Sequence, residues 1–134
     1  MKSVIFINNK FHGYDEERLK LEVGQLEWYL NRKKKKVHKI IIVNNDDELK
    51  EAKEYLTNTN ELINGDGVIT LEISDVSKSD NEIKEFIIAL DDRGITFRAF
   101  HEFFNTENDK EKDILLKCLN RFCNIEIVEG AIPF

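Results

Sequence analysis

Residues 65–106 read GDGVITLEISDVSKSDNEIKEFIIALDDRGITFRAFHEFFNT and carry the pattern of a strand, a helix and a second strand. The preceding turn, Asn64-Gly65-Asp66-Gly67, is dense in residues that accept a positive φ or bond to nearby backbone. Residues 68–73 then alternate and are rich in β-branched side chains, which predicts a strand. Ser79 and Glu82 form an S-x-x-E capping box, which predicts the start of a helix.

The helix and the strand after it complete this unit. Apolar residues from Ile83 to Leu90 recur at helical spacing and predict one buried face over residues 79–92. Gly94 stands just past the predicted helix end, and residues 95–100 begin the next strand. A strand, a crossover helix and a strand predict a parallel βαβ unit. Ligands of such sheets bind beyond the carboxyl ends of strands, so the candidate functional loop is Ser74–Lys78.

The rest of the chain continues the alternation of strands and helices. Before the central unit we expect a strand over 3–7, a polar loop over 8–14, a helix opening at Asp15, a strand over 37–43 and a helix opening at Asn45. After it we expect a helix over 111–122 and a short strand over 124–128. The alternation predicts a single domain, residues 1–134, of the α/β class, with three layers (α/β/α) around a mostly parallel sheet.

Composition places few limits on function. The 134 residues are 41% hydrophobic and 34% charged, with a net charge of −6, which argues mildly against a surface devoted to nucleic acid. No apolar run is long enough for a membrane span and no signal-peptide pattern opens the chain, so we expect a cytoplasmic protein. Cys118 and Cys123 are interpreted as free thiols, since they suit neither a disulfide nor a metal site. No phosphate-binding glycine motif occurs, so neither a cofactor nor a metal is expected.

Two groups of residues could carry chemistry. The first is formed by the loops after strands 1 and 3, which bring Lys10, His12 and Tyr14 toward Ser77 and its neighbours. We consider a solvated loop pair, a remnant ligand pocket and a His-Asp-Ser triad. The candidate ligand-binding or degenerate-site residues are Asn8, Lys10, His12, Ser74, Asp75 and Lys78. The second group is the basic run Arg32–Lys36, which is either the charged end of a helix or a phosphate patch.

The central unit resembles the N-terminal catalytic domain of serine recombinases, the resolvase/invertase family. In that family a Gly-Asp turn precedes an aliphatic strand, a loop of pattern L-D-R-L-x-R, a helix, and a Gly-Val or Gly-Ile that opens the next strand. An acidic stretch and a threonine follow. The same order is found here in Gly65-Asp66, residues 68–72, 73–78 and 79–92, Gly94-Ile95 and Asn105-Thr106. The resemblance implies a five-stranded sheet of order 2-1-3-4-5.

The residues that cut DNA in that family differ here. The resemblance places the nucleophilic serine on about Lys10 and arginines on Asp75 and Lys78. The lysine at position 78 cannot copy the bidentate donation of an arginine. Asp75 would put a negative charge where a phosphate should lie, a repulsion of about 1–4 kcal/mol at about 4 Å. The family's other residues, an arginine, an aspartate and a glutamine, fall on Asn8, Ser74 and Glu22. The resemblance therefore implies a degenerate domain without recombinase activity.

The last predicted helix is shorter than the family's dimer helix, and no helix-turn-helix follows, so specific DNA binding by the family's route is not expected. We expect a protein partner or a homodimer through its apolar face, formed by Leu115, Cys118, Leu119 and Phe122. Three hypotheses remain. The chain is an inactive interaction or regulatory module in a mobile-element or phage context, a small ligand-binding or enzymatic domain using the loops after strands 1 and 3, or an acidic immunity or inhibitor-type partner.

Overall fold

The computed structural model describes residues 1–102, 104–107, 110 and 113. Its sheet has the order β2-β1-β3-β4-β5, and the first four of these strands are parallel. The strands are β1 (Lys2–Asn8), β2 (Lys36–Val43), β3 (Gly67–Thr70), β4 (Thr96–Ala99) and β5 (Phe104–Asn105). The helices are α1 (Asn9–His12), α2 (Glu16–Arg32), α3 (Asp46–Asn58) and α4 (Asp80–Asp92), with a 3-10 turn at Ile73–Asp75.

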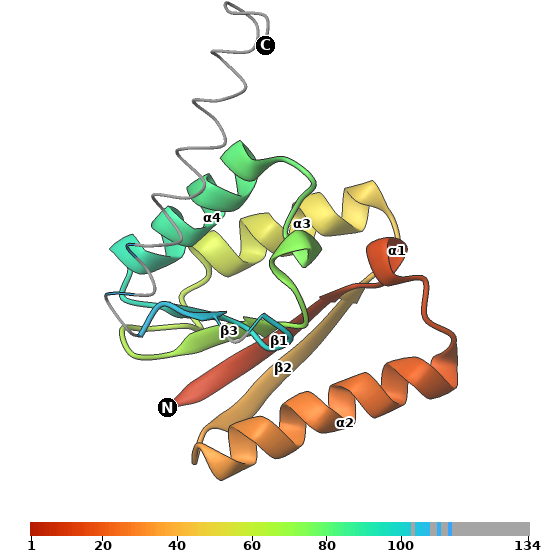
Figure 1. The fold of residues 1–134 in the computed structure, drawn as a ribbon. Helices are drawn as coiled ribbons and strands as arrows, with labels where there is room; N and C mark the ends of the chain where they lie inside the picture. Colours follow the sequence, from red (N-terminus) through yellow and green to blue (C-terminus); the bar gives the residue numbers. More distant parts are fainter. Residues whose placement is uncertain (103, 108–109, 111–112, 114–134) are drawn as a thin grey trace, which may run out of the picture.

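The three predicted layers are confirmed. Helices α3 and α4 cover one face of the sheet and α2 covers the other (Figure 1). Strand β1 lies between β2 and β3, and its alternating side chains supply both cores: Val4 and Phe6 face α3 and α4, while Ile5 and Ile7 face α2. Both faces are buried, which explains why β1 is a continuous apolar run.

Side-chain caps begin the three long helices at the positions expected from the sequence. Asp15, Asn45 and Ser79 accept hydrogen bonds from the backbone amides of Arg18, Glu48 and Glu82. The capping box at Ser79 is only half made, because the Glu82 carboxylate bonds to Ser77 instead of reaching back to the Ser79 amide. Gly94 has a φ of +71 just past the end of α4, as predicted.

Three local predictions were wrong. The polar loop over residues 8–14 contains the four-residue helix α1. Strand β3 ends at Thr70 instead of residue 73, because the Asp75 carboxylate accepts from the amides of Leu71 and Glu72 and turns the chain into the 3-10 helix. The described chain also adds β5, a two-residue strand antiparallel to β4. The fifth strand predicted over 124–128 lies outside the described residues.

The turn before β3 is fixed by one buried carboxylate. Asp66 is 4% exposed and accepts hydrogen bonds from the amides of Lys2 and Ile63, at 3.1 and 2.9 Å. Asp66 therefore ties the start of β1 to the turn that leads into β3. Within the described residues, no helix is both long enough and apolar enough to cross a bilayer.

Candidate functional site

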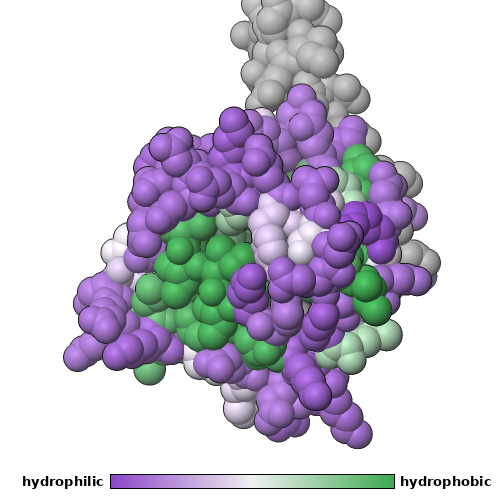
Figure 2. All heavy atoms as spheres, turned by 180° about the vertical axis from the view of Figure 1, so that it is seen from behind, coloured by the Kyte–Doolittle hydropathy of each residue, from purple (hydrophilic) through white to green (hydrophobic). Residues whose placement is uncertain are grey.

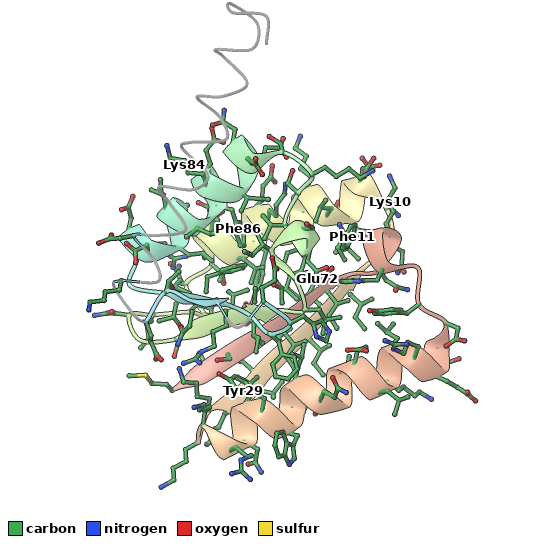
Figure 3. The ribbon with its side chains drawn as sticks, in the orientation of Figure 1. Lys10, Phe11, Tyr29, Glu72, Lys84 and Phe86 are labelled. Atoms are coloured by element: carbon green, nitrogen blue, oxygen red, sulfur yellow. The ribbon has the colours of Figure 1, made fainter. Side chains whose placement is uncertain are left out.

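A pocket of about 640 Å³ opens beside the carboxyl ends of β1 and β3. It lies between α1, the first turns of α3 and α4, and the loop that follows β3. Figure 3 shows Lys10 and Phe11 projecting from α1 near the start of α3. The lining residues are Asn8, Lys10, Phe11, Asp46, Leu49, Lys50, Lys53, Ser74, Ser77, Lys78 and Glu82.

Asparagine side chains hold the α1 wall of the pocket in place. Asn8 is buried at the end of β1, and its side-chain oxygen accepts from the amide of Phe11. Asn9 bonds both to the amide and to the carbonyl of Tyr14, at 2.9 and 3.1 Å. Gly13, with a φ of +66, ends α1 between them. These local bonds explain how a segment that looks like a polar loop becomes ordered.

The pocket is lined by more positive than negative charge. Among the described lining residues, four lysines face two carboxylates, which leaves a net charge of +2. Lys10 pairs with Asp46 at 2.8 Å, and this hydrogen bond lowers the pKa of Asp46. Lys53 lies 3.7 Å from Glu82. In the part of the chain that the structure describes, Lys50 and Lys78 line the pocket and form no ion pair, although the charge of Lys78 also acts on Asp46.

The buried hydroxyl of the pocket is already engaged. Ser77 donates to the Glu82 carboxylate and accepts from the amide of Ser79 at 3.0 Å. The hydrogen bond from Ser77, together with the charge of Lys53, lowers the pKa of Glu82. A carboxylate with a lowered pKa is a weaker base, so this pair is poorly suited to activating a serine for attack.

Behind the pocket, His12 and Asp75 form an ion pair that joins the two loops. Their side chains are 6% and 0% exposed. Burial raises the pKa of Asp75. Burial alone would lower the pKa of His12, but the hydrogen bond and the charge of Asp75 outweigh it, so the pKa of His12 is raised. Both shifts mean that the pair holds a shared proton tightly. The His12 ring also stacks on Tyr14, with centroids 4.9 Å apart.

This pair changes one prediction from the sequence. Asp75 was expected to present a negative charge where a phosphate should lie, but it points into the interior and does not line the pocket. Its carboxylate is occupied by His12 and by the amides of Leu71 and Glu72. Of the predicted His-Asp-Ser arrangement, the structure brings His12 and Asp75 together, while the Ser77 hydroxyl bonds to Glu82 instead.

The other candidate residues fall into structural roles. In the basic run, Lys35 is largely buried and pairs with Glu107 at 2.9 Å, and Arg32 lies over the Trp28 ring. Glu22 is buried against Arg18 and lies 3.4 Å from His101. No group of three metal-ligating side chains occurs among the described residues. The predicted interface residues Leu115, Cys118, Leu119 and Phe122, and the thiol of Cys123, lie outside the described residues.

Sequence reasoning brought Asn8, Lys10, Ser74 and Lys78 to the pocket but missed the wall that α3 supplies. Asp46, Lys50 and Lys53 follow one another at helical spacing and share one face of α3. That spacing was readable from the sequence. That this face of α3 lies beside α1 depends on how the helix packs in the complete fold, and the spacing of residues gives no information about that packing.

Solved structures match this chain over its whole length. The N-terminal catalytic domain of TP901-1 integrase matches with a TM-score of 0.70 and 12% identity, covering 100% of both chains. A resolvase family site-specific recombinase from Streptococcus pneumoniae matches with a TM-score of 0.75 and 11% identity, over 98% of this chain and 91% of that one. No protein-family model matches the chain, and no curated protein matches it.

The fold is that of the N-terminal catalytic domain of serine recombinases, as the resemblance in the central unit implied. The parallel strand order 2-1-3-4 is confirmed. At 11% and 12% identity, the likeness concerns the fold, and the chemistry has to be argued from this chain's own pocket.

Proposed function

We propose that the protein is a serine-recombinase-like domain that does not cut DNA and that acts as an interaction or regulatory module, in a mobile-element or phage context. The observation that carries the proposal is the identity and the pairing of residue 10, which is a lysine. It stands where the resemblance places the nucleophilic serine, and it is paired with Asp46. An ammonium group bears no lone pair for attack on phosphorus, and the Lys10 ammonium is engaged in an ion pair with the Asp46 carboxylate.

The remaining hydroxyls of the pocket support the same proposal. Ser77 is 8% exposed and bonded to Glu82, whose lowered pKa makes it a weak base. Strand transfer also needs guanidinium groups around the phosphate, because electrostatic stabilisation dominates phosphoryl transfer. Among the described residues, the pocket is lined by lysines and by no arginine. Lysines can attract a phosphate, but they lack the planar fork that holds two of its oxygens.

A search for a covalent DNA adduct tests the proposal. The purified chain is incubated with a library of random duplexes and supercoiled plasmid, denatured, and probed for DNA that stays attached to protein. We expect no adduct and no relaxation of the plasmid. An adduct would overturn the proposal, and the variants Ser74→Ala and Ser77→Ala would then show which hydroxyl forms it. The matched control is an active serine recombinase run on plasmid carrying its own site.

The second candidate function is binding of a phosphate-bearing small molecule in the pocket. It is favoured by the volume of about 640 Å³ and by Lys50 and Lys78, which form no ion pair in the described chain. Phe11, 42% exposed, and Leu49 add an apolar side to the same pocket. Charged donors around an apolar wall are what a nucleotide or a phosphorylated metabolite requires.

Titration calorimetry with pyrophosphate and with a nucleoside triphosphate tests the second candidate. Removing both charges in Lys50→Gln/Lys78→Gln should weaken binding by at least about tenfold, since one charge-assisted hydrogen bond contributes about 1.5–3 kcal/mol. The control Lys20→Gln/Arg32→Gln removes two charges from α2 and should leave affinity unchanged. Absence of binding by the unmodified chain, or an equal loss in the control, contradicts the candidate. The adduct assay is independent of this result.

A further inference from the structure

We propose that the outer edge of β2 is an interaction surface on which a second copy of this chain adds its own β2 in antiparallel orientation. Strand β2 is the edge of the sheet, and β1 is its only strand partner in the described chain. It runs for eight residues, Lys36–Val43, so a long row of backbone groups faces away from the sheet. Such an edge is a template for another strand unless the sequence blocks it.

The first half of β2 is blocked in the ways that natural edge strands use. The register shifts at Ser3 and Val4, which pair with Val37 and Lys39, so that His38 bulges out of the ladder. Lys36 and Lys39 add charge. The Glu61 carboxylate lies 2.9 Å from His38 and 3.9 Å from Lys39 and covers this half. A bulge and edge lysines both discourage strand addition.

The second half of β2 has none of these devices. Residues 40–43 are Ile-Ile-Ile-Val, and they pair with β1 in unbroken register from Ile5–Ile40 to Asn8–Val43. Ile40 is 41% exposed and Ile41 and Ile42 are half-buried, although the β1 residues beside them are fully buried. Figure 2 views the molecule from the side on which β2 lies and shows an apolar patch framed by hydrophilic residues. This half of the edge is apolar, and its residues carry no charge.

Because one half of β2 is basic and the other half is apolar, the strand is suited to pairing with β2 of a second copy in antiparallel orientation. In an antiparallel pair centred on Ile41, Ile40 lies opposite Ile42 of the second copy, and apolar residues meet apolar residues. Lys39 then lies opposite Val43, so the two Lys39 residues are about 13 Å apart, beyond the screening length of about 8 Å at physiological salt. A parallel in-register pair would place the lysines side by side. The antiparallel pair is also closed by a two-fold axis.

Sedimentation velocity and amide hydrogen exchange on the full chain test the proposal. From low to high micromolar concentration, the mass should rise from 15.7 kDa toward twice that value. Exchange of the amides of residues 40–43 should slow over the same range, which a dimer through another face would not produce. Ile40→Lys should weaken dimerisation by at least about tenfold, because edge lysines oppose pairing.

The matched control is Ile88→Lys on α4, where the replaced isoleucine is 36% exposed. It should dimerise like the unmodified chain, and circular dichroism checks that both variants fold. A chain that stays monomeric at every concentration overturns the proposal. So does a dimer that survives Ile40→Lys, or one whose residues 40–43 exchange at a rate independent of concentration, since either result assigns the contact to another surface.

Discussion

His12 and Asp75 join the loops after β1 and β3 through an ion pair that water barely reaches. Removing one partner of such a pair leaves a buried group without compensation, which typically costs about 3–5 kcal/mol. Asp75 also caps the amides of Leu71 and Glu72, so its loss affects the end of β3 as well. These two residues are therefore expected to matter more for stability than the exposed lysines of the pocket.

The pair predicts a pH dependence of stability. Because the pKa of His12 is raised in the folded chain, the folded state binds more protons than the unfolded state between pH ~6.5 and the folded pKa. The contribution is fully present below pH ~6.5, the unfolded value for histidine, and is lost as pH rises through the folded pKa. Urea unfolding across this range should show a free energy of unfolding that falls with rising pH.

Two variants test whether the pH dependence of the free energy of unfolding comes from His12 and Asp75 or from other groups. His12→Asn keeps a donor toward Asp75 but cannot titrate, so it should flatten the dependence on pH. Asp75→Asn should lower the free energy of unfolding by about 3–5 kcal/mol at pH 6, where the pair holds its proton. A slope that persists unchanged in His12→Asn would show that other groups produce it.

Local chemistry predicted the long elements well. The caps at Asp15, Asn45 and Ser79 and the glycine after α4 are short-range signals, and each lies where the sequence indicated. The elements that were missed, α1 and the 3-10 turn after β3, are short. Both are closed by side-chain bonds to nearby backbone, from Asn8 and Asn9 in α1 and from Asp75 in the 3-10 turn. The pairing of Asp75 with His12, which lies 63 positions earlier, then joins the two segments. Periodicity carries no information about such contacts.

Gly94, just past the end of α4, and Gly24, within α2, give opposite predictions for the effect of an alanine substitution on stability. Gly94 has a φ of +71, and an added Cβ would lie 2.1 Å from the side-chain oxygen of Asn64, so Gly94→Ala should destabilise by at least about 1–3 kcal/mol. Gly24 lies within α2 with nothing within 4 Å of an added Cβ, so Gly24→Ala should stabilise by about 1 kcal/mol. Thermal unfolding of both variants checks the pair. A loss of stability in Gly24→Ala would mean that its helix face is covered.

Across the whole molecule, the class and strand order followed from the alternation of strands and helices and from the family resemblance, whereas the charge of the site did not. The lysines of α3 reach the pocket only because α3 packs beside α1, a consequence of the complete fold. The chain has a net charge of −6, yet its pocket carries +2. Total charge therefore gives a poor account of what this domain attracts, since local arrangement decides the field that a ligand meets.

The central position of β1 has a consequence for how the chain comes to be folded. Its strand partners lie far along the sequence, with Lys2 beside Lys36 and Ser3 beside Gly67. During synthesis, β1 emerges from the ribosome before its partner strands and stays without its second neighbour until β3 has emerged. Pairings over such separations form slowly, because loop closure comes before any gain from contact. The strand that holds the finished domain together is thus the segment that a nascent chain most needs to have shielded.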